Sequence, residues 1–345
     1  MARVKYLSQA IKFIKHPIKS RVLIGLFVLA CFAVSLSIIL QYQLNNPATG
    51  LKKGNPTQII TSISKNNDAG QLFKSGPFVA TPTWTQDFQT MPNGPLSSKL
   101  WSFDIGNGGP NNPGWGNNEA EYYTDNLSNV RIENGQLIIE AKKQSEDGFS
   151  YTSARIKTVP SLDFTYGKLD IIAKLPSGIG SWPAMWLLPT NGIYESYTPA
   201  GEADPNDYLH DGEIDMLEAV GTIPGQITSS AQSYVYNPRN NNERIAETNL
   251  SDDASTFNDY ELQWTPTSLK FLVNGVAYHT VNRAKTDSTD IWPYNQSFYL
   301  ILNVAMGGTE GGTDSQQYPP YGIDDTSGPW EMAIKSIDYY PYVKN

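Results

Sequence analysis

The sequence predicts an all-β fold, and three observations lead to this prediction. Gly (28), Pro (23) and Tyr (20) are abundant among the 345 residues, while charged residues make up only 17%. This balance is typical of a turn-rich β protein rather than a helical bundle. From about Phe78 onward, short apolar runs alternate with Gly, Pro and Asn turns, and none keeps a 3.6-residue period for three helical turns. Many short strands at this spacing indicate a sandwich or a barrel.

Individual strands can be placed by their turn residues. Residues 129–143 and 269–281 each contain an Asn-Gly pair, at 134–135 and 274–275. Asn-Gly favours the tight turn that joins two antiparallel strands, so both segments are predicted β-hairpins. Further strands are expected at 168–175, 260–264, 298–306 and 335–343.

The N-terminal part has a different character. Residues 1–21 contain six Lys or Arg and no acid, and Val22–Leu40 is an uncharged apolar run of about the length that crosses a bilayer. A basic stretch before such a run stays in the cytoplasm. We therefore expect a cytoplasmic segment at 1–21, a single-pass signal-anchor at 22–40, a flexible polar stalk at 41–75 and a folded extracellular domain at 76–345. The alternative is a signal peptide cleaved after Ser35, which would leave the domain secreted.

Charge and cysteine content restrict the partners. The formal net charge is −9 although residues 1–21 are strongly basic, so the folded domain is more acidic than the whole chain. An acidic body argues against nucleic acid as a partner and suits a neutral ligand. Cys31, the single cysteine, lies in the apolar run, so no disulfide is expected in the exported domain. A stalked domain needs no partner chain, and we expect a monomer.

Residues 210–221, HDGEIDMLEAVG, place three acids within an apolar segment. In a strand, Glu213 and Asp215 point to one face, whereas strict alternation puts Glu218 on the other. A β-bulge at Met216-Leu217 would restore the phase, because two residues of one strand then face one residue of its neighbour. The sequence therefore predicts a bulged strand with all three acids on one face.

Such a group of acids suits the cleavage of a glycosidic bond. That reaction needs one carboxylate as nucleophile or base and one carboxylic acid that protonates the leaving oxygen. Crowded like charges raise the pKa of at least one member, which keeps an acid protonated near neutral pH. A solvated acidic strand edge and a calcium site are the alternatives, but neither explains the apolar residues between the acids.

The chain resembles glycoside hydrolase family 16, in the laminarinase-like branch with the signature Glu-x-Asp-x-x-Glu. Besides the acids, five segments carry the resemblance in the family's order: WGNNEAEYYT (115–124), YTSARIKT (151–158), FTYGKLDIIAKLPSGIGSWPAMWLLP (164–189), FYLILNVAMGG (298–308) and IDYYPY (337–342). The resemblance implies a β-jelly-roll sandwich with a concave cleft that cuts internal β-glucan bonds with retention. It also implies that Glu213 is the nucleophile, Asp215 its helper and Glu218 the general acid/base.

Candidate sugar-binding residues come from the aromatic content and from the resemblance. Indole and phenol rings offer flat apolar faces to sugar rings. The resemblance implies hydrogen bonds to sugar hydroxyls from an Asn, a Glu and an Arg. The chain departs from the family in three places, because Tyr208-Leu209 stands where many relatives have Trp-Pro, and Gln232 and Asn258 each stand where relatives have a His. The substrate-binding candidates are Trp115, Asn118, Glu119, Arg155, Trp182, Trp186, Tyr208 and Gln232, and SGIGSWP (177–183) is the expected cleft-edge loop.

No cofactor is expected for catalysis, but the resemblance suggests a structural calcium ion. Hard cations take oxygen ligands. The candidates are the backbone carbonyls of Asp87 and Gly135 and the carboxylate of Asp338.

Three functions are thus open. The first is an endo-acting β-glucanase for β-1,3 or mixed β-1,3/1,4 glucan. The second is a transglycosylase, or a hydrolase of another polysaccharide such as a galactan, that uses the same acids. The third is a glucan-binding or sensing module without activity, because a fold does not fix a function.

Overall fold

A computed structural model describes residues 77–110, 112–192, 207–250, 256–311 and 322–343. The expected signal-anchor at 22–40 and stalk at 41–75 lie outside the described residues. Within the part of the chain that the structure describes, no helix is long and apolar enough to cross a membrane.

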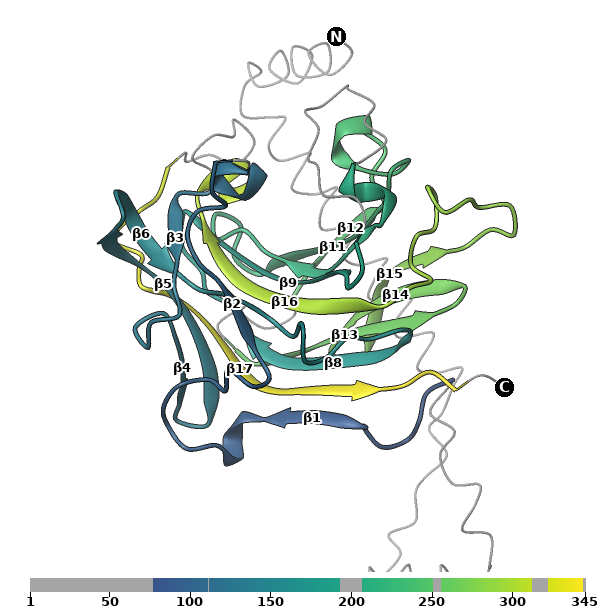
Figure 1. Cartoon of the computed structure of the whole chain (residues 1–345), viewed down its shortest axis with the longest axis horizontal. Helices are drawn as coiled ribbons and strands as arrows, with labels where there is room; N and C mark the ends of the chain where they lie inside the picture. The colour runs from purple at the N-terminus through teal and green to yellow at the C-terminus, as the bar shows by residue number, and fades with distance from the viewer. Residues whose placement is uncertain (1–76, 111, 193–206, 251–255, 312–321, 344–345) are drawn as a thin grey trace, which may run out of the picture. The chain divides into compact units, whose positions relative to one another are not determined.

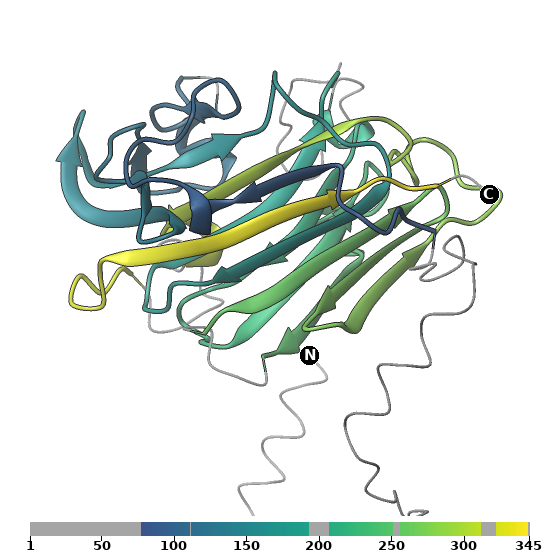
Figure 2. The same ribbon diagram turned by 90° about the horizontal axis from the view of Figure 1, so that it is seen from below.

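Two β-sheets form the folded domain (Figure 1). The ten-stranded sheet contains, in spatial order, β15 (Val276–Asn282), β14 (Ser268–Val273), β13 (Asn258–Thr265), β8 (Gly167–Lys174), β17 (Trp330–Tyr340), β5 (Gln136–Glu146), β6 (Phe149–Ser153) and β3 (Glu121–Tyr123), with β1 (Trp84–Asp87) beside β17 and β4 (Val130–Glu133) beside β5. The seven-stranded sheet contains β12 (Ile245–Asn249), β11 (Gln226–Gln232), β10 (Glu213–Glu218), β9 (Ser181–Pro189), β16 (Phe298–Met306), β7 (Arg155–Lys157) and β2 (Ser102–Asp104). Seen from below, β1 runs alongside β17 (Figure 2). The expected β-sandwich is confirmed.

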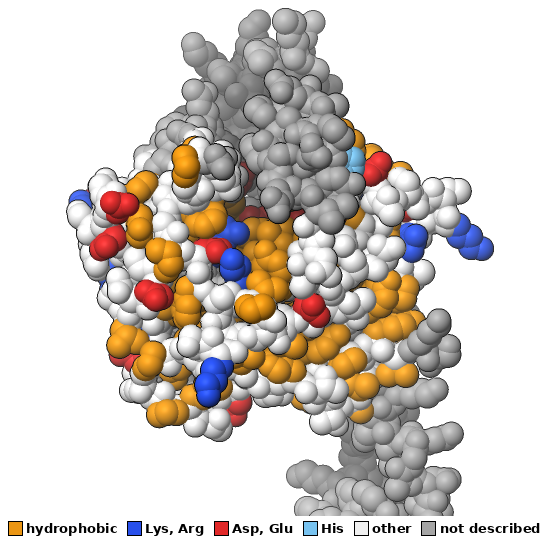
Figure 3. All heavy atoms as spheres, viewed as in Figure 1, with side chains coloured by type: hydrophobic (Ala, Val, Ile, Leu, Met, Phe, Trp, Pro, Cys, Tyr) orange, Lys and Arg blue, Asp and Glu red, His pale blue; other side chains and the backbone are white. Residues whose placement is uncertain are grey.

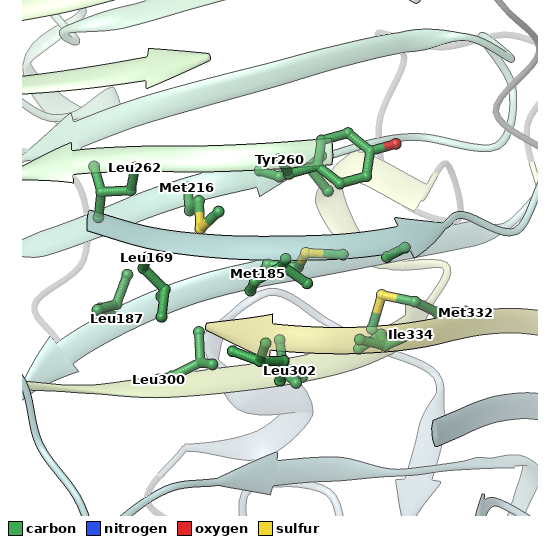
Figure 4. Close-up of a cluster of buried hydrophobic side chains, with 14 of the residues drawn as sticks. Leu169, Met185, Leu187, Met216, Tyr260, Leu262, Leu300, Leu302, Met332 and Ile334 are labelled. Carbon is green, nitrogen blue, oxygen red and sulfur yellow. The ribbon is translucent and has the colours of Figure 1, made fainter. Parts of the chain in front are cut away.

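The core lies between the sheets, and alternation along each strand builds it. In β9 and β16, every second side chain points to the core, and these residues are buried apolar ones such as Met185, Leu187, Leu300 and Leu302 (Figure 4). The ten-stranded sheet supplies the opposing layer. Each fully buried side chain of this size stabilises the fold by about 1.5–3 kcal/mol. The other face of the seven-stranded sheet remains available for polar and aromatic residues.

Both predicted hairpins are confirmed. β4 pairs with β5 and β14 with β15, both antiparallel. Asn134 and Gly135 have φ of 51° and 72°, and Asn274 and Gly275 have φ of 50° and 76°. Positive φ at both central residues defines the turn that Asn-Gly favours.

Strand boundaries differ from the sequence-based expectation by one or two residues at β8 and β13, and by more at two other places. The strand expected at 335–343 is β17, which begins earlier, at Trp330, and ends at Tyr340. Pro341 follows, and proline has no N–H for a sheet hydrogen bond. The expected cleft-edge loop at 177–183 is shorter than predicted, because β9 begins at Ser181.

Asp259 on β13 gives the domain a pH-dependent stability. Burial raises its pKa to about 7, and a hydrogen bond and the charge of Asp170 add to the rise. Because the folded state then holds a proton that the unfolded state has released, stability falls as pH rises from about 4 to about 7. Asp259→Asn removes this loss. We expect its urea midpoint to exceed that of the wild type increasingly from pH 4 to pH 8. The exposed Asp125→Asn serves as the control, and an advantage independent of pH contradicts the assignment.

Candidate active site

The bulge in β10 is confirmed by its register with both neighbours. Asp215 lies opposite Ser230 of β11 and Glu218 opposite Thr228, so three steps on β10 match two on β11. The register with β9 shifts at the same place. Ile214, Met216 and Leu217 are buried in the core, and the three acids share the opposite face.

Neutral donors on neighbouring strands surround the acids. Glu213 is 9% exposed and Asp215 is 3% exposed. Gln232 Nε2 donates to Glu213 Oε1 and to Asp215 Oδ2, both at 2.9 Å, and the Ser230 hydroxyl also donates to Asp215. On the other side, Trp182 Nε1 donates to Glu218 Oε1 at 3.0 Å. The strands on both sides of β10 thus hold the carboxyl groups in place.

Burial raises the pKa of Glu213 and of Glu218 well above the usual range, and the charge of Asp215 raises both further. Burial also raises the pKa of Asp215, while hydrogen bonds from Ser230 and Gln232 oppose that rise. Glu213 and Asp215 are buried and Glu218 is half-buried, and full ionisation of three carboxyl groups this close together is unfavourable. The group therefore retains a proton near neutral pH, as a general acid requires.

Trp182 offers a test of this electrostatic arrangement. Its N–H bonds the ionised form of Glu218 and so lowers that group's pKa, against the effect of burial. Trp182→Phe removes the donor and keeps a ring, so Glu218 should stay protonated to higher pH. We expect the alkaline limb of the kcat/KM profile to move to higher pH, measured on a soluble glycan substrate. An unmoved or acid-shifted limb contradicts the assignment.

Trp186 of β9, Arg155 of β7 and Trp115 form a stack of side chains beside the acids, which we call the floor of the site. The Arg155 guanidinium lies 4.5 Å from the ring centre of Trp115 and 4.7 Å from that of Trp186. Its Nε also pairs with Asp104 at 3.0 Å. Trp186 Nε1 donates to Asn303 Oδ1 of β16 at 2.8 Å. Cation–π contacts therefore fix the positions of both indoles.

Tyr208 in the short helix η5 (Tyr208–His210) lies at one end of the acid group. A pocket of about 450 Å³ is lined by Tyr208 together with Leu188, Asp211 and Tyr299. Burial and the nearby charge of Glu213 raise the pKa of Tyr208 well above its usual range.

Figure 3 shows a patch of apolar side chains on the face toward the viewer, with basic and acidic side chains beside it.

The structure brings most of the predicted substrate-binding residues together. Trp182, Trp186 and Gln232 neighbour the acids, and Trp115 and Arg155 form the stack. Two others differ. Asn118 is exposed in a left-handed conformation (φ 56°). Glu119 is only 7% exposed, and both of its carboxyl oxygens bond protein donors, so it lies below the surface rather than offering itself to a sugar.

The sequence did not predict four polar residues that support the site, which are Ser230, Asn303, Asp104 and Glu121. A signal for Ser230 exists, because alternate residues of β11 are polar at Thr228, Ser230 and Gln232. Asn303 is the polar residue within the apolar strand β16. Asp104 and Glu121 become recognisable only when the strands have been assembled.

Two of the predicted calcium ligands already accept hydrogen bonds from protein hydroxyls, and the calcium ion stays a prediction. The Asp87 carbonyl accepts from the Thr90 hydroxyl, and the Asp338 carboxylate accepts from the Thr85 hydroxyl. Gly135 packs closely against Gln89 in its turn. The described residues contain no group of three or more His, Cys, Asp or Glu that could hold a metal ion.

Neighbouring carboxyl groups on one face of a sheet, with indoles beside them, suit the cleavage of a glycosidic bond. The family model described as "Glycosyl hydrolases family 16" matches residues 117–326. The chain belongs to this family and is a glycoside hydrolase.

Three similar proteins extend the comparison. A beta-glucanase from Rhodothermus marinus is 32% identical over 267 residues, covering 76% of this chain and 85% of that protein. The crystal structure of a laminarinase from Flavobacterium sp. UMI-01 matches with a TM-score of 0.62 and 35% identity, over 75% of this chain and all of that one. A beta-1,3-glucan-binding protein from Penaeus monodon is 32% identical over 208 residues, covering 52% of this chain and 50% of that protein.

Proposed function

We propose that this chain is a retaining, endo-acting glycoside hydrolase that cleaves internal β-1,3 or mixed β-1,3/1,4 linkages of a neutral glucan. The observation that carries the proposal is the β-bulge, which places Glu213, Asp215 and Glu218 on one face of β10, where burial and the charge of Asp215 raise the pKa values of both glutamates. The named activities of the beta-glucanase and the laminarinase described above support the choice of glucan.

The chemistry follows from the surroundings of each acid. Glu213 attacks the anomeric carbon while the protonated Glu218 gives its proton to the leaving glycosidic oxygen, which yields a glycosyl ester on Glu213 and a shortened glucan. Glu218, now ionised, takes a proton from water, the resulting hydroxyl attacks the anomeric carbon, and Glu213 is released. Asp215, which shares the Gln232 donor with Glu213, tunes the charge of its neighbour.

Acidic side chains around the site favour an uncharged polymer. Glu310 and Glu243 both act electrostatically on Glu218. A sulfated chain would bring further negative charge into this region, and like charges repel strongly where water is excluded. A neutral glucan avoids this cost.

A panel of polysaccharides tests the proposal. Laminarin, a mixed β-1,3/1,4 glucan, agarose and keratan sulfate are incubated with the enzyme, and the products are sized over time. We expect oligosaccharides of intermediate length to appear early from the first two substrates. Release of glucose alone contradicts endo action, and cleavage confined to a galactan supports the alternative substrate class.

The non-catalytic alternative is supported by one relative, the beta-1,3-glucan-binding protein. The polysaccharide panel separates the hydrolase from the binding module, because a binding module releases no reducing ends from laminarin. Its binding is seen separately, as slower migration in a gel that contains laminarin. Longer products from a transglycosylase would appear in the same sizing experiment.

We propose further that residues 22–40 hold the enzyme at the outer surface of a membrane, on the basis of their apolar sequence after a basic segment. Extraction of cell membranes with alkaline carbonate tests this. Release of the full-length chain by carbonate contradicts the anchor.

A further inference from the structure

A second pair of buried carboxyl groups lies beneath the sugar-binding floor. Glu119, Glu121 and Tyr123 alternate in an extended segment, so their side chains point to the same side. Glu119 is 7% exposed, and Glu121 and Tyr123 are fully buried. The proposed reaction uses neither glutamate, and burying two carboxyl groups is costly without compensation.

The two glutamates have different partners. Glu119 accepts hydrogen bonds from the Tyr123 hydroxyl at 3.0 Å and from Asn117 Nδ2 at 3.3 Å, one on each oxygen. Glu121 Oε2 accepts from the Met306 amide at 2.7 Å. Glu121 Oε1 is buried without a donor among the described residues, and its carboxyl group is in hydrogen-bonding contact with that of Glu119. A proton on Glu121 Oε1, donated to Glu119, satisfies all four oxygens.

The charged surroundings agree with a single shared proton. Among the described residues, neither glutamate forms an ion pair. Arg155 acts electrostatically on Tyr123, but its guanidinium lies between two indoles and pairs with Asp104. Tyr123 is the other titratable group that faces the pair. Burial first, and then the charge of Glu119, raises the pKa of Glu121 well above its usual range.

From this pair, hydrogen bonds lead to the floor of the site. Tyr123, which donates to Glu119, accepts from Asn303 Nδ2 at 3.2 Å, and Asn303 Oδ1 accepts from the Trp186 indole. Trp186 stacks on Arg155. On the other side, Gly308 lies so close that an added Cβ would be 3.5 Å from both Glu119 and Trp182. The pair thus lies under both indoles that flank the catalytic acids.

We propose that Glu119 and Glu121 form a one-proton carboxyl pair that positions Trp186 and its Arg155 stack for glucan binding. The two glutamates are positioning residues, because they act through Tyr123 and Asn303 and do not touch the sugar. The proposal rests on the proposed function for its kinetic readout.

Three variants test the pair. Glu121→Gln keeps the donor, since its amide N–H₂ replaces the proton and its oxygen still accepts from Met306. We expect KM and kcat for laminarin within about twofold of the wild type, because every hydrogen bond is retained. Glu121→Leu removes the donor. Glu119→Gln makes the same amide substitution at the other glutamate. It loses one of the acceptor bonds and moves the charge to the fully buried position 121. For both of these, KM should rise about 3- to 10-fold, the effect of losing one such hydrogen bond, with a smaller change in kcat.

Stability against pH gives a readout that does not depend on activity. Because the folded-state pKa of Glu121 is raised, the wild type should lose stability as pH rises from the ordinary Glu value toward the raised one. The decrease of the unfolding midpoint with pH should be smaller in Glu121→Gln than in the wild type, because Asp259 and the catalytic acids still contribute to it.

The outcomes separate the two proposals. If the wild type cleaves no glucan, the proposed function fails, while a smaller decrease of stability with pH in Glu121→Gln than in the wild type still supports the shared proton. If Glu121→Gln raises KM as much as Glu121→Leu does, or if the two Gln variants behave alike, the pair does not share a proton in the way proposed. A lower unfolding midpoint with unchanged KM in all three variants indicates a structural role only and overturns the positioning.

Discussion

Glu213→Gln is expected to lower kcat on laminarin by about 10⁴-fold or more, the scale seen when a covalent nucleophile is removed. An amide cannot form the glycosyl ester, yet it has nearly the shape of the carboxyl group and can still bond Gln232. Binding of laminarin should therefore persist. The measurement is reducing-end release, with affinity electrophoresis in laminarin for binding.

A suitable control is Glu331→Gln, a partly exposed residue on β17 of the other sheet whose contact with Lys174 is 3.6 Å long. Surface ion pairs of this kind contribute little, so its activity should equal that of the wild type. If Glu213→Gln retains more than a few per cent of wild-type turnover, Glu213 is not the nucleophile.

Glu218→Gln is expected to lower kcat by about 10²- to 10⁴-fold on polysaccharide, the usual contribution of a general acid/base. The rate of the first step, in which the glycosyl enzyme forms, should fall much less with an activated aryl β-glycoside, because such a leaving group departs without a proton. Azide, which attacks without a general base, should then restore turnover and give the β-glycosyl azide. The products are identified by NMR.

The two glutamate variants distinguish the roles of the acids. Azide cannot produce the β-azide in Glu213→Gln, because that product requires a glycosyl enzyme to be displaced. Rescue of Glu213→Gln with the β-azide, or failure to rescue Glu218→Gln on the activated substrate, would exchange or abolish the roles assigned here.

The bulge and the triplet could be predicted because their signals are local. The acids at 213, 215 and 218 can all lie on one face of a strand, with the apolar residues on the other, only if the strand contains one extra residue. The Asn-Gly hairpins are local for the same reason. These features require no knowledge of which strands are neighbours.

The roles of Glu119 and Glu121 could not be predicted in this way. In the sequence, Glu119 resembles a residue that contacts sugar, and only the pairing of segment 119–121 with the end of β16 shows that it is buried. Asn303 and Tyr123 are 180 residues apart in the chain. The order of the strands decides which polar side chains meet under the floor of the site. A local sequence pattern does not reveal that order.

The central claim is that β10 presents a nucleophile and an acid on one face and that the reaction proceeds through a glycosyl enzyme. The most direct test is the anomeric configuration of the first product, followed by ¹H NMR during the first minutes of laminarin hydrolysis, before mutarotation. Two successive displacements predict that the β-anomer appears first and the α-anomer only later. Initial appearance of the α-anomer would contradict the account.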